Sequence, residues 1–259
     1  MNETLAHRPR SDVRLSGQKR GAKYRVRDIL IMHLVALAVS FLIKAYVLRP
    51  FYIPSASMDH TLQVGDTVPV NELAPSLLPV GRGDIVVFKD PGGWVPRKEQ
   101  GAQNPVEAGI SWLGSLFLSG HSAPDENDHV IKRVIGVAGD HVACCTVSGQ
   151  VTINGSPIYE PYVLLPEGTT TVSESPFDVV VPPGALWVMG DNCYKSADSH
   201  AHRNDPDKGF VHLSNVVGRA FALSWPPWHW TWLDNYPDVF RGVDRNRSAS
   251  GLPAVVTPH

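Results

Sequence analysis

The chain has 259 residues, of which 43% are hydrophobic and 19% are charged, and its formal net charge at pH 7 is −2. This length suffices for one or two domains with a sizeable core. A balance this close to neutral argues against a nucleic-acid partner, because such partners favour a strongly basic protein.

The N-terminal part of the chain differs from the rest in charge. Residues 1–28 carry eight basic and three acidic side chains with few apolar residues, so we expect a disordered basic arm. Residues 29–48 are mostly apolar, and a helix of that length spans about 30 Å, the thickness of a bilayer core. The basic flank predicts a single-pass plasma-membrane helix with a cytoplasmic N-terminus and everything after residue 48 outside.

Two other interpretations of this stretch remain. It could be a buried core helix, or a cleavable signal peptide, since Ser55-Ala56-Ser57 has small residues spaced like a cleavage site. The length of the apolar run and the intervening Arg49-Pro50-Phe51 favour the membrane helix.

Beyond residue 48 the chain consists of short β-like runs separated by glycine and proline. Asn154-Gly155 between two such runs predicts a tight turn. We expect one mainly β, antiparallel domain of sandwich or barrel type over residues 49–239, with a small β subdomain at about 143–186 and a disordered tail at 240–259. The runs are 67–70, 84–88, 130–137, 151–153, 178–181, 185–189 and 216–223.

Two segments interrupt this pattern. Residues 89–129 form an insertion whose apolar stretch, 108–119, suits an amphipathic helix lying on the membrane or packed on the core. Residues 224–233 contain four of the seven tryptophans, which suits either a contact with the membrane interface or an aromatic core cluster.

The three cysteines are Cys144, Cys145 and Cys193. Because the number is odd, at least one thiol is unpaired or paired with another molecule. A bridge between the adjacent Cys144 and Cys145 is compatible with an extracytoplasmic domain but demanding for disulfide geometry. His200 and His202 could chelate a metal, but we favour an ordinary exposed polar loop.

Ser57 is a candidate nucleophile just beyond the predicted membrane surface, and it needs a base to remove its proton. Lys132 lies in a run whose two strand faces are both apolar, so burial would favour its neutral amine. Arg133 cannot act as a base because a guanidinium keeps its proton. The alternatives are a lysine extending from a strand edge to solvent and an ordinary loop serine.

Four segments in order resemble those of the bacterial type I signal peptidases, membrane-anchored Ser/Lys proteases that remove signal peptides from exported proteins. They cover most of the chain from about residue 50 to 220, and together they are more specific than any one alone. The segments are Pro54-Ser55-Ala56-Ser57-Met58 with Thr61-Leu62 and Gly65-Asp66, Arg82 to Phe88, Ile131 to Gly136 with Gly139-Asp140, and Gly190-Asp191-Asn192 with Ser196-Ala197-Asp198-Ser199.

The resemblance implies specific roles. Ser57 corresponds to the nucleophile and Lys132 to the general base, while the Ser57 N–H and the Ser55 hydroxyl would form the oxyanion hole. Ser196 would hydrogen-bond the lysine amine. Supporting residues of the site would be Asp191, Asn192 and Asp198, and shallow pockets for small substrate side chains would be lined by Phe51, Ile53, Pro54, Met58, Val87 and Ile131.

The resemblance further implies that signal-peptide-bearing preproteins, membrane lipid and the secretion translocon are partners, and that no metal or organic cofactor is required. Four positions depart from the family pattern: His60 and Ala138 replace prolines, and Cys193 and His200 replace arginines. The lost arginines leave the ion pairs around Asp198 in doubt, and His200 is a candidate substitute. The alternatives are a self-cleaving Ser/Lys repressor and a non-catalytic, membrane-anchored β-domain.

Overall fold

The structure is a computed structural model that describes residues 18–46, 48–95, 128–173 and 175–244. The chain divides into two compact units, residues 1–45 and 46–259. Most of the expected insertion, including its apolar stretch 108–119, lies outside the described residues.

The described part of the first unit is one helix. Helix α1 (Gln18–Tyr46) begins well before the expected residue 29, and Leu48, expected to end it, is instead the first residue of a strand. In the described portions of the chain, no helix combines the length and the apolar character needed to cross a membrane.

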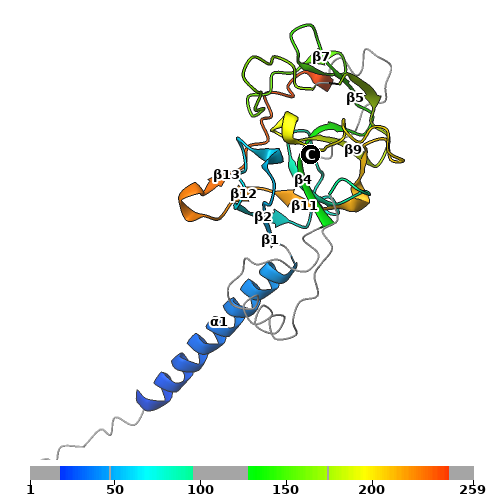
Figure 1. The fold of residues 1–259 in the computed structure, drawn as a ribbon. Helices are drawn as coiled ribbons and strands as arrows, with labels where there is room; N and C mark the ends of the chain where they lie inside the picture. Colours follow the sequence, from blue (N-terminus) through cyan, green and yellow to red (C-terminus); the bar gives the residue numbers. More distant parts are fainter. Residues whose placement is uncertain (1–17, 47, 96–127, 174, 245–259) are drawn as a thin grey trace, which may run out of the picture. The chain divides into compact units, whose positions relative to one another are not determined.

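The second unit is built on a seven-stranded sheet in the order β1-β2-β11-β3-β4-β9-β10, and every pair within it is antiparallel (Figure 1). The predicted mainly β, antiparallel class is therefore confirmed. The strands are β1 (Leu48–Tyr52), β2 (Thr67–Asn71), β3 (Ile85–Lys89), β4 (His129–Val137), β9 (Ala185–Met189), β10 (Val211–His212) and β11 (Val216–Ala220).

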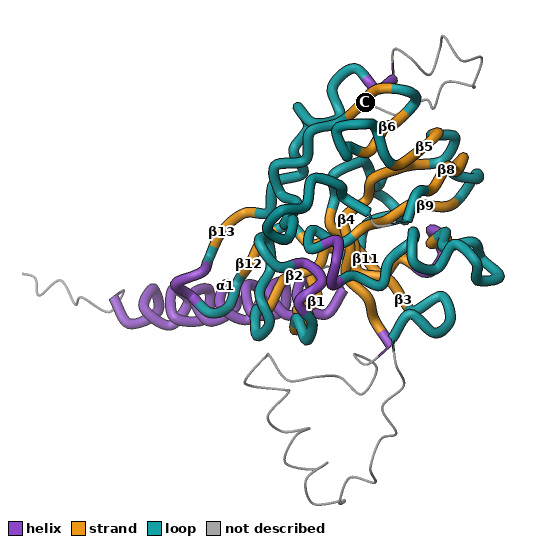
Figure 2. The backbone as a smooth tube through the Cα atoms, turned by 45° about the horizontal axis from the view of Figure 1, so that its top comes forward, coloured by secondary structure: helices purple, strands orange, loops and turns teal. Residues whose placement is uncertain are grey.

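Two smaller sheets complete the unit, with the order β7-β6-β5-β8 in one and the pair β12-β13 in the other. The first lies next to β4 and β9, and the second lies next to β2 (Figure 1, Figure 2). Their strands are β5 (His141–Cys144), β6 (Val151–Ile153), β7 (Ser156–Pro157), β8 (Phe177–Val180), β12 (Ala222–Leu223) and β13 (Thr231–Trp232). The predicted turn at Asn154-Gly155 joins β6 to β7, and both residues have positive φ, 52° and 77°.

Strand β4 is an interior strand of the large sheet, and both of its faces are covered. Seven consecutive residues, 130–136, are buried between neighbours β3 and β9. One apolar cluster includes Ile131 and another includes Val130 and Val134. The burial expected for Lys132 is therefore confirmed: it is 3% exposed.

Two findings concern the C-terminal part of this unit. Phe240 and Val243, assigned to the tail from sequence, are buried in the cluster under the small sheet, so the folded part continues through these residues. The aromatic-core alternative for residues 224–233 is wrong, because Trp225, Trp228, Trp230 and Trp232 are all more than half exposed.

Candidate active site

Ser57 and Lys132 meet although they are 75 residues apart in sequence. Ser57 lies on a single 3-10 turn, Ala56–Met58, that follows β1, and Met58 anchors this turn by full burial in the core. The Asn192 N–H donates to the Ser57 carbonyl at 3.1 Å, which fixes the turn from the other side. Lys132 projects from β4 and its Nζ donates to Ser57 Oγ at 2.6 Å.

The environment of Lys132 favours its neutral form. Burial lowers the pKa of the amine from 10.5 to about 8, while the negative charges of Asp198 and Asp191 act in the opposite direction. With that pKa, about one-tenth of the amines are neutral at pH 7, because the pH lies one unit below the pKa. The pair can therefore present an unprotonated base to a serine hydroxyl.

Ser55 stands at the mouth of this site. It is exposed, and its hydroxyl lies 3.3 Å from that of Ser57. A hydroxyl in this position can turn toward an oxygen that forms next to Ser57.

Ser196 lies close to the pair but does not bond the lysine as expected. Its hydroxyl is buried and has no hydrogen-bond partner among the described residues, whereas the Lys132 amine donates to Ser57. Gly190 separates Ser196 from Ser57, and a Cβ there would lie 2.4 Å from the Ser57 carbonyl oxygen and 2.6 Å from Ser196 Cβ. The close packing of these two segments therefore requires glycine.

Asp198 is held without the arginine that the family pattern supplies. It is fully buried and accepts bonds from the N–H groups of Gly190 at 2.9 Å and His200 at 3.2 Å. His200 Nδ1 lies 2.5 Å from the same carboxylate. His200 is thus the side chain that faces the Asp198 carboxylate.

Arg133 connects several distant segments of the chain near the site. It is 0% exposed and forms a two-bond ion pair with Asp191, Nε to Oδ1 at 2.9 Å and Nη2 to Oδ2 at 2.7 Å. Its Nη1 also donates to the carbonyls of Gly83 and Asp234, and Thr61 Oγ1 donates to the same Asp191 carboxylate at 2.5 Å. The pair therefore joins residues from all four family segments.

The role of Arg133 was missed in the sequence, although a signal was present. A charged side chain in a strand with two apolar faces must be paired, because an unpaired buried charge is very costly. The partner, Asp191, could not be identified from one sequence.

A second group that sequence reasoning missed packs on this ion pair. The Arg133 guanidinium lies 4.1 Å above the Tyr162 ring, whose hydroxyl donates to Glu160 at 3.0 Å. Burial raises the pKa of Glu160 to about 7, and the Asp191 charge acts in the same direction. His60 Nδ1 bonds the Tyr162 carbonyl at 3.1 Å, so this departure from the family pattern has a local partner.

The expected pocket residues lie around Ser57 but are mostly core. Five of the six are at most 7% exposed and belong to one apolar cluster, namely Phe51, Ile53, Met58, Val87 and Ile131. Pro54 is exposed.

The two histidines weighed as metal ligands have other partners. His202 stacks on Trp94 with ring centroids 4.6 Å apart and bonds Asp205 at 2.7 Å, while His200 bonds Asp198. Among the described residues, no group of three or more His, Cys, Asp or Glu side chains is arranged to hold a metal ion.

Comparison with known proteins identifies the family of this chain. The signal peptidase family, peptidase S26, matches residues 26–225, and the chain belongs to this family of serine endopeptidases. Signal peptidase I of Mycobacterium tuberculosis is 36% identical over 225 residues, covering 79% of this chain and 74% of that protein. The probable signal peptidase I of Mycobacterium leprae is 36% identical over 226 residues, covering 78% and 77%, and signal peptidase I of Leptolyngbya laminosa is 34% identical over 184 residues, covering 71% and 72%.

Proposed function

We propose that this chain is a membrane-anchored signal peptidase that removes N-terminal signal peptides from exported preproteins with a Ser57–Lys132 dyad. The observation that carries the proposal is the 2.6 Å contact between a fully buried lysine amine and a serine hydroxyl. The family membership and the names of the relatives support the choice of substrate.

The chemistry follows from the two groups. Neutral Lys132 takes the proton of Ser57. Ser57 Oγ then attacks the carbonyl carbon of the small residue that precedes the cleaved bond of the preprotein. The resulting ammonium gives its proton to the leaving amine, and the neutral amine then activates a water molecule that hydrolyses the acyl-enzyme. Because burial keeps the lysine pKa near the working pH, both directions of proton transfer are accessible.

Neighbouring groups would assist these steps. The Ser55 hydroxyl and the Ser57 N–H would donate to the oxyanion, and a single such donor is worth about 3–4 kcal/mol in related hydrolases. Ser196, whose buried hydroxyl has no other partner among the described residues, would orient the amine once Lys132 releases Ser57. Asp191, Asn192 and Asp198 would hold the loop that carries it.

The membrane would bring enzyme and substrate together. The apolar stretch of the sequence and its basic flank support a single membrane anchor at residues 29–48, with the basic N-terminus in the cytoplasm and the peptidase domain outside the cell membrane. The four exposed tryptophans of residues 225–232 suit the headgroup region. Two tethered molecules meet at raised effective concentration, and lipid and the translocon are the expected neighbours.

The test is cleavage of a preprotein with a small-x-small site by the full chain in detergent or lipid. We expect one cut after the second small residue, identified by the N-terminal sequence of the product. A chain that is inert on several such preproteins would instead favour a non-catalytic, membrane-anchored domain.

Replacing His200 with arginine is expected to move the acidic limb of the kcat/KM profile to lower pH. The Asp198 carboxylate raises the pKa of Lys132, and a histidine offsets that negative charge only while it is protonated. An arginine remains charged, so it would neutralise Asp198 at every pH and lower the lysine pKa. His200→Gln, which keeps a hydrogen bond without charge, is the control; an unchanged profile in His200→Arg would refute this role.

A further inference from the structure

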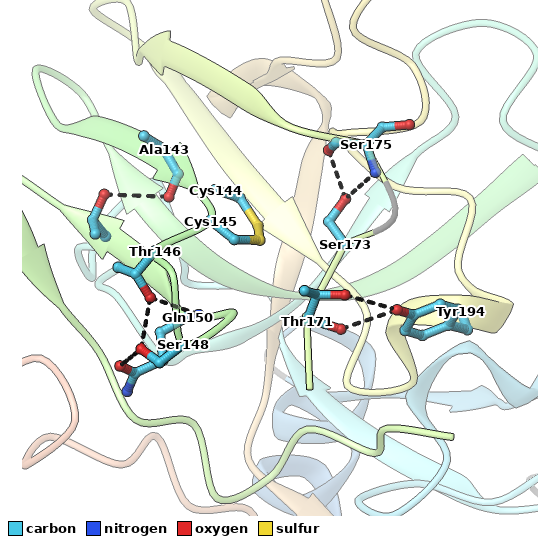
Figure 3. Close-up of a disulfide and its surroundings, with 11 residues drawn as sticks. Ala143, Cys144, Cys145, Thr146, Ser148, Gln150, Thr171, Ser173, Ser175 and Tyr194 are labelled. Atoms are coloured by element: carbon cyan, nitrogen blue, oxygen red, sulfur yellow. Dashed lines mark hydrogen bonds between the residues drawn. A yellow bond between two sulfur atoms is a disulfide. The ribbon is translucent and has the colours of Figure 1, made fainter. Parts of the chain in front are cut away.

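The adjacent residues Cys144 and Cys145 are joined by a disulfide bond (Figure 3). Cys144 is the last residue of β5 and is buried, whereas Cys145 is exposed. One end of the bond is therefore at the surface and the other is packed against the core of the small sheet.

This bond contributes little to the stability of the whole fold. A disulfide stabilises a protein largely by restricting the unfolded chain, and the effect grows with loop length, reaching about 3 kcal/mol for a loop of about 15 residues. A bridge between neighbours restricts almost nothing beyond the two residues themselves. Its consequences must therefore be local.

A cavity of about 340 Å³ lies beside the bond. Both cysteines line it, together with Ala143, Thr152 and Asp178, which are cross-strand neighbours on β5, β6 and β8. The small Ala143 side chain lies between the two larger ones and leaves a hollow on this face of the sheet. The volume falls in the range of small-molecule pockets, about 300–1,000 Å³. Because Cys145 is exposed and lines this cavity, a small thiol compound has access to Cys145.

The third cysteine has a different environment. Cys193 is a free thiol, 5% exposed, and burial raises its pKa well above the usual range. A buried thiol that keeps its proton is a poor nucleophile. Thiol–disulfide chemistry is thus confined to the adjacent pair.

The pair is connected to the catalytic loop by contacts of Thr171 and Phe177. Phe177 is the register partner of Cys144 and lines the same cavity. Its ring centroid lies 6.3 Å from that of His200, which bonds the Asp198 carboxylate near Lys132. A second contact comes from Tyr194, whose hydroxyl donates to the Thr171 carbonyl at 3.1 Å (Figure 3).

We propose that Cys144 and Cys145 form a thiol–disulfide exchange site for small dithiols, and that opening this bond lowers peptidase activity through Phe177 and the Asp198–His200 pair. The activity part rests on the proposed function. Opening the bond frees the end of β5, and Phe177 then loses the fixed neighbour that holds it toward His200.

The exchange is a two-electron reaction. One thiolate of the dithiol attacks the exposed Cys145 sulfur, the S–S bond breaks, and Cys144 leaves as a thiolate that takes a proton. The second thiolate of the reductant then attacks the mixed disulfide and releases Cys145, which is protonated in turn. The dithiol is oxidised to its own cyclic disulfide, and both cysteines end as thiols.

The experiment uses the full chain in detergent, a cysteine-free preprotein and dithiothreitol as the probe. Thiols are counted by alkylation and peptide mass mapping under native conditions, and kcat/KM is measured before reduction, after it and after reoxidation. We expect Cys144 and Cys145 to be alkylated and Cys193 protected. We also expect a reversible fall in kcat/KM of about two- to thirtyfold, the size of coupling carried by packed side chains.

The double substitution Cys144→Ser/Cys145→Ser is the matched control, and dithiothreitol should leave its activity unchanged. A pair that resists reduction in the folded protein, or that is reduced with no change in kcat/KM, would overturn the proposal. Failure of the proposed function would look different, because the oxidised enzyme would then cleave nothing while the alkylation pattern still reported on the exchange site.

Discussion

Ser57→Ala and Lys132→Met are each expected to reduce cleavage by about 10⁴-fold or more, the scale seen when a nucleophile or its base is removed from a serine protease. Without Ser57 Oγ no acyl-enzyme forms, and without the Lys132 amine the serine keeps its proton. The measurement is kcat/KM on a preprotein with a small-x-small site. Variants that retain a tenth of the wild-type rate would contradict the dyad.

Loss of folding would be a trivial cause of inactivity, and Lys132→Met excludes it. Below pH 8 the native state buries a charged amine whose pKa has fallen from 10.5 to about 8, a difference of roughly 3 kcal/mol in favour of unfolding. Between these two pKa values the native state releases its proton first, so wild-type stability should rise with pH. The methionine variant should be inactive, more stable than the wild type at pH 7, and free of this rise.

Arg133→Met is expected to destabilise the domain by about 3–5 kcal/mol, the cost of removing one partner of a buried ion pair. The Asp191 carboxylate, 1% exposed, would be left with a buried charge, and the Gly83 and Asp234 carbonyls would lose a donor. Chemical denaturation at pH 7 measures the change in the free energy of unfolding.

Arg241→Met is the matched control, since Arg241 pairs with Asp238 on the surface and both side chains are about three-quarters exposed. Exposed pairs contribute little, so this variant should unfold like the wild type. If the two arginine variants lost equal stability, the Arg133–Asp191 pair would not be the brace that joins the four family segments.

The positions of strands were predicted well where apolar residues and turn formers alternate. The runs at 67–70, 130–137 and 185–189 correspond to β2, β4 and β9, within a residue at either end. Strand β1 was missed because Leu48 continues an apolar helix and Pro50 interrupts the pattern of a strand. The sequence has no local signal that marks where helix α1 ends and strand β1 begins.

The site was predictable in part for physical reasons. Burial of Lys132 followed from the two apolar faces of its strand, and its meeting with Ser57 came from the family resemblance. The Tyr162 contact with Arg133 depends on tertiary packing between distant segments, which one sequence does not reveal. The same holds for Ser196, whose hydroxyl was expected to bond the lysine but has no partner among the described residues. Sequence alone also cannot decide which two of the three cysteines form the disulfide bond.

The pH dependence of kcat/KM for the wild-type enzyme tests the central claim most directly. If Lys132 is the base, activity should be low in acid, where the amine is charged, and should rise along a limb with an apparent pKa of about 8. A limb near pH 6.5, the ordinary value for histidine, or one near 10.5, that of an unburied lysine, would contradict the account.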